Sequence, residues 1–152
     1  MTPPLLVFAW GNASRGDDAL GPLFAEQMRA TVAARSDVEV LDDYQLQVEH
    51  ALDLVGRQRV LFVDASLSCG APFTVQALQA APDASITTHA LSPQALLQVY
   101  PQVSDAPAPA CTLLAIRGQR FELGEPPSAA ALRHLQEALR WAQSWLKGVP
   151  LP

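Results

Sequence analysis

An apolar run followed by a glycine-containing loop and then a helical pattern is the feature that most constrains the fold of this chain. Residues 5–9 are apolar and predict a buried strand, and a helical pattern begins near residue 19. Between them, Gly11 and Gly16 have the G-x-x-x-x-G spacing of a phosphate-binding loop. Such a loop continues with Lys and then Ser or Thr, whereas here Asp17 and Asp18 follow. Because two carboxylates repel phosphate and attract cations, the loop predicts contact with a metal ion or with a partner that carries one.

Short apolar segments alternate with helical patterns along the rest of the chain. The predicted strands are residues 5–9, 38–41, 60–63, 73–78 and 112–116. Helical patterns begin near Leu20 and Val48, at Pro93 with Ser92 as N-cap, and after a second N-cap, Ser128. This alternation predicts an α/β sandwich in one domain, 1–152, since the chain has 152 residues. Segment 73–78 alternates in polarity, which favours an edge or antiparallel strand.

The spacing of apolar residues predicts which side chains the helices bury. In the first helix the predicted buried face is Leu20, Phe24, Met28 and Val32. In the short second helix it is Val48, Leu52 and Val55. In the last helix it is Leu132, Leu135, Leu139, Ala142 and Leu146.

Charge and composition exclude several classes of partner. The net charge is −5 and the basic residues are scattered, so we expect no binding to nucleic acid. The apolar runs are far shorter than the roughly 18 residues that a membrane span requires. The first residues have no positively charged segment of the kind that begins a signal peptide. Cys69 and Cys111 lie far apart and predict no disulfide framework, so we expect a cytoplasmic protein without membrane contact.

Acidic residues follow two of the predicted strands. Asp17 and Asp18 follow the first strand, and Asp64 ends the third. Open α/β sheets bind ligands beyond the carboxyl ends of their strands, so these carboxylates should converge if the two strands are neighbours. His89, just before a helix, is the third candidate. Two carboxylates with one imidazole suit Zn²⁺ or Ni²⁺ better than Mg²⁺, which prefers oxygen ligands only.

Each candidate also has a structural interpretation. Asp17 or Asp18 could cap the first helix, although one carboxylate is enough for that. Asp64 could bind nearby backbone N–H groups, and His89 could be a solvated loop residue. Glu49 and His50 open the second helix and are either further site candidates or an acidic first turn.

The sequence also allows other chemistries. Gln45 and Gln47 could bind an extended peptide backbone or could simply be polar surface residues. Cys69 could act as a nucleophile with His89 as its base. The glycine loop could belong to a nucleotide-binding module, for which Arg15 is the one basic residue in the loop. A serine hydrolase with a G-x-S-x-G elbow is disfavoured because that motif does not occur.

Several of these motifs, taken in order, resemble the nickel–iron hydrogenase maturation endopeptidases. The first comprises Gly11-Asn12, then Gly16-Asp17-Asp18 and Gly21-Pro22. The next are Val63-Asp64-Ala65 and His89 before a short helix. The last are residues 113–118 and the long C-terminal helix, so the resemblance spans nearly the whole chain. Ala19 stands where many members of the family have Gly.

The resemblance implies a fold, a reaction and a set of site residues. The fold is a mixed five-stranded sheet between helices, in which segment 73–78 is the one antiparallel strand. The reaction removes a C-terminal peptide from the precursor of the hydrogenase large subunit after nickel insertion. Asp18, Asp64 and His89 are then the catalytic and metal-contacting residues, and the precursor itself supplies the nickel, with no organic cofactor. Asp17 would cap the helix or hold the loop in place.

The resemblance leaves the attacking group open, because either a protein side chain or water activated by the metal could attack the peptide bond. It also leaves an alternative function, in which the protein binds nickel as an accessory protein or chaperone and cleaves nothing. Residues 45–50 resemble the members that serve cytosolic, cofactor-coupled hydrogenases.

Overall fold

A single mixed sheet forms the centre of the protein in the computed structural model, which describes residues 1–82 and 91–148. Its strands are β1 (Leu5–Trp10), β2 (Val38–Asp43), β3 (Arg59–Ser66), β4 (Phe73–Ala77) and β5 (Ala110–Arg117). Their order across the sheet is β2-β1-β3-β5-β4. β4 pairs antiparallel to β5, and every other pair is parallel. The predicted five-stranded sheet with segment 73–78 as its antiparallel strand is therefore confirmed.

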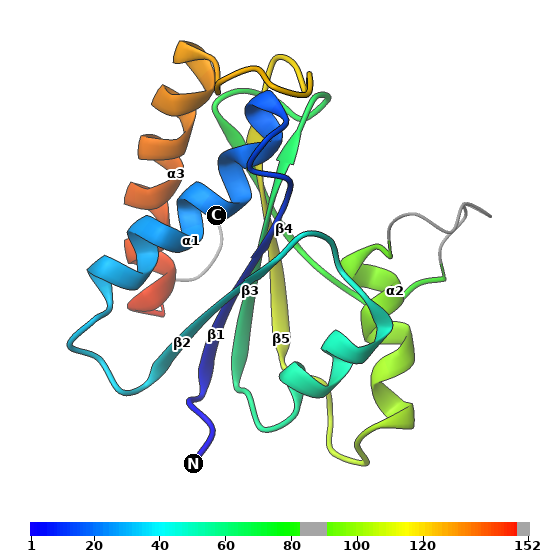
Figure 1. Ribbon diagram of the computed structural model, residues 1–152. Coiled ribbons are helices and arrows are strands. Elements are labelled where there is room, and N and C mark those ends of the chain that lie inside the picture. Colours follow the sequence, from blue (N-terminus) through cyan, green and yellow to red (C-terminus); the bar gives the residue numbers. More distant parts are fainter. Residues whose placement is uncertain (83–90, 149–152) are drawn as a thin grey trace.

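Helices cover both faces of this sheet (Figure 1). The long helices α1 (Leu20–Thr31) and α3 (Ala129–Leu146) pack side by side on one face. The other face is covered by the 3₁₀-helix η2 (Val48–Leu54) and by α2 (Pro93–Val99), which continues into η3 (Tyr100–Gln102). A further 3₁₀-helix, η1 (Gly16–Ala19), leads into α1. The three-layer α/β sandwich predicted from the sequence is confirmed.

Alternate residues of the central strands point into two separate cores, as the two-residue period of a strand requires. Leu5, Val7 and Ala9 of β1 face α1 and α3. Leu6 and Phe8 of the same strand face η2 and α2. Nearly all of these side chains are excluded from solvent, which explains why β1 and β3 are continuous apolar runs in the sequence.

The predicted helix caps and the buried face of α1 are confirmed. The hydroxyl of Ser92 accepts a hydrogen bond from the N–H of Ala95, and that of Ser128 accepts one from the N–H of Ala131. The predicted face of α1 is at most 6% exposed and consists of Leu20, Phe24, Met28 and Val32. No helix of residues 1–82 and 91–148 is long and apolar enough to cross a membrane.

Two predicted helix faces are wrong in detail. In η2 the side chains of Val48 and Leu52 are exposed and those of Ala51 and Leu54 are buried. The two buried residues are three apart, as the period of a 3₁₀-helix requires, and Val48 at the start of the helix does not join them. In α3 the expected Leu132 is 41% exposed. Leu135, Ala142 and Leu146 of the predicted face are buried, and Ala131, Ala138 and Trp145 complete the buried row of α3.

β3 is longer than its apolar run predicted, and this corrects the place of Asp64. Asp64 lies inside the strand and not at its end, because β5 continues alongside and pairs Asp64 with Ala115 and Ser66 with Arg117. The pairing between β1 and β3 stops one residue earlier, at Ala9 and Val63. Asp64 therefore lies just beyond the last residue pair with β1, beside the loop that leaves β1.

Candidate active site

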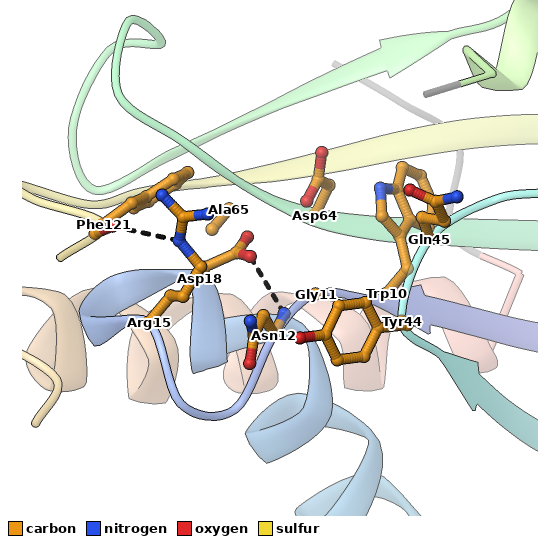
Figure 2. Close-up of a pocket in the computed structure, with 10 residues that line it drawn as sticks. All are labelled: Trp10, Gly11, Asn12, Arg15, Asp18, Tyr44, Gln45, Asp64, Ala65 and Phe121. Atoms are coloured by element: carbon orange, nitrogen blue, oxygen red, sulfur yellow. Dashed lines mark hydrogen bonds between the residues drawn. The ribbon is translucent and has the colours of Figure 1, made fainter. Parts of the chain in front are cut away.

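Asp18 and Asp64 line one pocket at the carboxyl edge of the parallel strands. The pocket has a volume of about 350 Å³. The remaining lining residues come from four segments of the chain and are Trp10, Gly11, Asn12, Arg15, Tyr44, Gln45, Ala65 and Phe121. Figure 2 shows the two carboxylates on opposite sides of the space between the β1–η1 loop and β3. The predicted convergence of these two residues is thus what the fold produces.

Close backbone packing brings the β1–η1 loop to this place. Gly11 has a φ of +152°, and a Cβ atom there would lie 2.1 Å from the carbonyl oxygen of Asp18. A Cβ atom on Gly21 would lie 2.1 Å from the carbonyl oxygen of Trp10. The first turn of α1 therefore rests directly on the end of β1, and the glycines of the sequence motif are required by this contact.

One backbone contact orients the carboxylate of Asp18. The N–H of Asn12 donates to Oδ2 of Asp18 at 2.9 Å. The side chain of Asn12 accepts in turn from the N–H of Ser14 at 2.8 Å, which fixes the loop around it. The other carboxylate oxygen of Asp18 has no hydrogen-bond donor among the described residues and is available to a ligand in the pocket.

The environment of Asp64 opposes its ionisation. Burial is the main cause and the negative charge of Asp18 is the second, and together they raise the pKa of Asp64 from 3.8 to about 7. Hydrogen bonding from the N–H of Ala65 and from the indole of Trp10 acts in the opposite direction but is weaker. A carboxyl group with this pKa can hold or release a proton near neutral pH, and a cation between the two carboxylates would favour the ionised form of both.

The loop does not have the free amides of a phosphate cradle. The N–H groups of residues 11, 12 and 14–18 are all donated within the protein, to Asp43, Asp18, Asn12, Arg15, Glu125 and Arg120. Phosphate binding by such a loop needs these donors to point at the ligand. The nucleotide-binding interpretation is therefore contradicted by the loop's hydrogen bonds as well as by its charge.

Asp17 lies on the far side of the loop from the pocket and is 0% exposed. Its Oδ1 accepts from the N–H of Ser128 at 2.6 Å, and its Oδ2 accepts from the hydroxyl of Ser128 at 2.8 Å. Oδ2 also accepts from the N–H groups of Gln119 and Arg120 at 2.7 and 3.3 Å. Desolvation alone would raise the pKa of Asp17, but these donors outweigh it and lower the pKa. Asp17 does not cap η1, so of its two predicted structural roles the structure supports the one in which it holds the loop.

The candidates at the start of the second helix do not all reach the pocket. Gln45 lines it, whereas Glu49 is exposed and outside it. The imidazole of His50 is held between Asp43, whose Oδ2 lies 3.0 Å from Nε2, and the N–H of Gln47, which donates to Nδ1 at 2.9 Å. These contacts give His50 and Gln47 a structural role in the turn before η2, where they form a capping box.

Cys69 lies in the loop after β3 but does not line the pocket. Its sulfur lies 3.5 Å from the carbonyl oxygen of Ala115, and its own carbonyl accepts from the guanidinium of Arg117 at 2.6 Å. His89 lies outside the described residues, so its predicted pairing with Cys69 and its predicted place beside Asp18 and Asp64 both stay predictions. Among residues 1–82 and 91–148, no group of three or more His, Cys, Asp and Glu side chains forms a metal site.

Three aromatic residues line the pocket that the sequence patterns did not predict. Trp10 ends β1 next to Asp64, and its position after the first apolar run was a usable signal. Tyr44 follows β2 and could have been found in the same way, because ligand-binding residues follow strands at this edge. Phe121 comes from the loop after β5 and is brought in by tertiary contacts that no local pattern indicates.

Several solved structures with this fold are hydrogenase maturation proteases. The [NiFe] hydrogenase maturation protease HycI of Thermococcus kodakarensis superposes with a TM-score of 0.74 at 21% identity, over 95% of this chain and 93% of that one. The hydrogenase maturating endopeptidase HybD of E. coli gives 0.69 at 20% identity, over 95% and 92%. No family model matches the sequence, and no curated protein matches it either. These likenesses establish that the chain has the fold of these proteases.

Proposed function

We propose that this protein is an endopeptidase that removes a C-terminal peptide from the precursor of a nickel–iron hydrogenase large subunit after nickel has been inserted. The single observation that carries the proposal is the pair Asp18 and Asp64, which face each other in a pocket at the carboxyl edge of the sheet. The fold supports it, because proteins with these names share nearly the full length of the chain. The motif order of the sequence supports it independently.

Nickel belongs to the substrate in this proposal and arrives with the precursor. Two facing carboxylates suit a divalent cation. Burial is the main cause of the raised pKa of Asp64, and the second cause is the negative charge of Asp18, which such a cation would neutralise. His89 is the proposed third ligand. Bound nickel can polarise a carbonyl group or a water molecule, which is the chemistry that a metal ion supplies to hydrolysis.

The chain's own residues orient the substrate and hold a proton. Asn12 fixes one oxygen of Asp18, so that the other is directed at the ligand. Asp64 is able to accept a proton near neutral pH, because burial and Asp18 raise its pKa to about 7. Trp10, Tyr44 and Phe121 give the pocket walls that can pack on the precursor peptide and exclude water. The cytoplasm stays the predicted compartment of the reaction.

The experiment compares nickel-loaded and nickel-free precursor as substrates of the purified protein. We expect a loss of mass from the loaded precursor only, and none with Asp18→Asn, Asp64→Asn or His89→Ala. Asp105→Asn is the matched control, because Asp105 is an exposed carboxylate in the loop that precedes β5, at the opposite edge of the sheet.

Two other outcomes would contradict the proposal. Stoichiometric nickel binding with no change in the length of the precursor would instead support an accessory or chaperone function. Cleavage by the Asp18, Asp64 and His89 variants at the rate of the unmodified protein would remove these residues from the mechanism.

A further inference from the structure

Two loops far apart in the sequence are joined behind the pocket. Segment 11–18 follows β1 and segment 118–128 connects β5 to α3. Three backbone hydrogen bonds link them. The N–H of Asp17 donates to the carbonyl of Arg120 at 2.9 Å, that of Gly16 to the carbonyl of Glu125 at 3.0 Å, and that of Gly124 to the carbonyl of Ser14 at 2.7 Å. We refer to these two joined segments as the loop clasp.

The carboxylate of Asp17 lies at the centre of the loop clasp. It comes from one segment, and all four of its hydrogen bonds go to the other, to Gln119, Arg120 and Ser128. The space around it is filled, since a Cβ atom on Gly118 would lie 2.8 Å from the Cβ of Asp17. A fully buried charge with four donors is a rigid arrangement, because any opening of the clasp leaves both the charge and the donors unpaired.

One wall of the pocket depends on the loop clasp. Asp18 and Arg15 lie in the first segment and Phe121 lies in the second. The guanidinium Nε of Arg15 donates to the carbonyl of Phe121 at 3.3 Å, which joins the two segments of the clasp where they line the pocket (Figure 2). Asp64, in contrast, is held by the sheet itself through the pairing of β3 with β5. The relative position of the two facing carboxylates is therefore set by the sheet on one side and by the clasp on the other.

We propose that Asp17 is a positioning residue for the cleavage reaction, and that its carboxylate closes the loop clasp so that Asp18 faces Asp64 at the correct separation. Asp17 touches neither the pocket nor the substrate and acts through Asp18. The inference rests on the proposed function, since it assigns a role within that reaction. A misplacement of about 1 Å at a reacting site can lower the rate about 10²-fold, so a clasp of this kind affects the rate far more than it affects binding.

The test compares Asp17→Asn with Met28→Ala. The Asn side chain keeps the shape of Asp17, but its NH₂ group replaces one of the two oxygens that accept hydrogen bonds. It therefore cannot accept from all four donors of the clasp. Met28 is 1% exposed and lies in the last turns of α1, away from the pocket, so Met28→Ala destabilises the fold without opening the clasp. Both variants are assayed at a temperature at which each remains folded. We expect kcat for the nickel-loaded precursor to fall about 10²-fold in Asp17→Asn, with KM changed much less, and to stay near the wild-type value in Met28→Ala.

Equal losses of activity in the two variants, or a rise in KM alone, would overturn the proposal. If Asp17→Asn does not fold, Ser128→Ala and Ser128→Thr replace it. The first removes the hydroxyl donor to Asp17, and the second restores it, so only Ser128→Thr should retain the wild-type kcat.

Hydrogen exchange separates this inference from the proposed function. The N–H of Asn12 is protected by its bond to Asp18, so we expect faster exchange at Asn12 in Asp17→Asn and not in Met28→Ala. Unchanged protection at Asn12 would refute the positioning role even in a protein that cleaves. If the unmodified protein cleaves nothing while this exchange pattern is found, the proposed function fails and the geometric role of Asp17 stands.

Discussion

Asp17 and Asp18 are neighbours in the sequence, yet they lie in opposite kinds of environment. Asp17 is turned into the loop clasp, where four donors surround it and no solvent reaches it. Asp18 is turned into the pocket, where one backbone N–H holds it opposite a second carboxylate, Asp64. The same type of side chain thus joins two loops at one position and lines the pocket at the next.

The difference shows how a protein can keep carboxylates close together. Hydrogen-bond donors lower the pKa of Asp17 and bind its charge into the fold. Burial and a like charge raise the pKa of Asp64, so the pocket side of the loop stores unfavourable electrostatic energy that a cation or a proton relieves. A folded chain tolerates this arrangement because the clasp, on the other side of the same loop, is fully satisfied.

The largest expected effect is a loss of cleavage activity when a carboxylate of the pocket side is neutralised. Asp18→Asn and Asp64→Asn should lower cleavage of the nickel-loaded precursor by about 10²–10³-fold or more, because each removes a charge that faces the ligand. Neither should lower the melting temperature, since each relieves repulsion in the empty pocket. Steady-state kinetics and thermal melts measure both quantities. A large loss of stability in either variant would mean that the pocket carboxylates also hold the fold together.

A methyl group added beside Asp17 tests how much the packing of the loop clasp contributes to stability, without changing a charge. Gly118→Ala should destabilise the protein by about 1–3 kcal/mol, because the new Cβ would lie 2.8 Å from the Cβ of Asp17 and 3.2 Å from the ring of Phe121. Gly70→Ala is the control, since its Cβ would meet only the methyl group of Thr74 at 3.8 Å. Denaturant unfolding measures both changes. Equal stability of the two variants would show that Asp17 and Phe121 can move to accommodate the new methyl group at no cost in stability.

The contributions of Asp64, on the pocket side, and Asp17, on the clasp side, to stability should also change with pH in opposite directions. Asp64 has a folded pKa of about 7 against 3.8 as its ordinary value, so its contribution to stability is complete below pH 3.8 and is lost as the pH rises through 7. The lowered pKa of Asp17 gives a contribution that is present above pH 3.8 and is lost as the pH falls further. Thermal melts in a chelating buffer should therefore show Asp64→Asn gaining stability over wild type between pH 4 and 8. A difference that is independent of pH would contradict the raised pKa of Asp64.

The smallest expected effect concerns the alternative nucleophile. Cys69→Ser should leave cleavage and stability nearly unchanged, because Cys69 does not line the pocket and its sulfur faces the carbonyl of Ala115. Treatment of the unmodified protein with a thiol alkylator, followed by the cleavage assay, gives a second measurement. Inactivation in both experiments would favour a cysteine hydrolase and would move the reacting site to the loop after β3.

The sequence predicted the strands, the order of helices and the antiparallel strand because burial on both faces of a sheet leaves long apolar runs. It also predicted that Asp18 and Asp64 converge, since both lie near the ends of neighbouring strands. It misplaced the buried face of η2, where Ala51 and Leu54 are buried in place of Val48 and Leu52 because the segment is a 3₁₀-helix and not an α-helix. Phe121 could not be predicted, because its place in the pocket depends on contacts between segments about a hundred residues apart.

The sequence by itself determined the scaffold and the charge of the site. An apolar strand, a glycine loop and two aspartates lack the cation that a phosphate loop needs and predict contact with a metal ion or its carrier. The tertiary structure alone decided which aspartate does what. Adjacent residues in η1 point in different directions, so the donors of segment 118–128 meet Asp17 and leave Asp18 to Asp64. A carboxylate's role depends on the groups around it, and those groups are brought together only when distant parts of the chain pack.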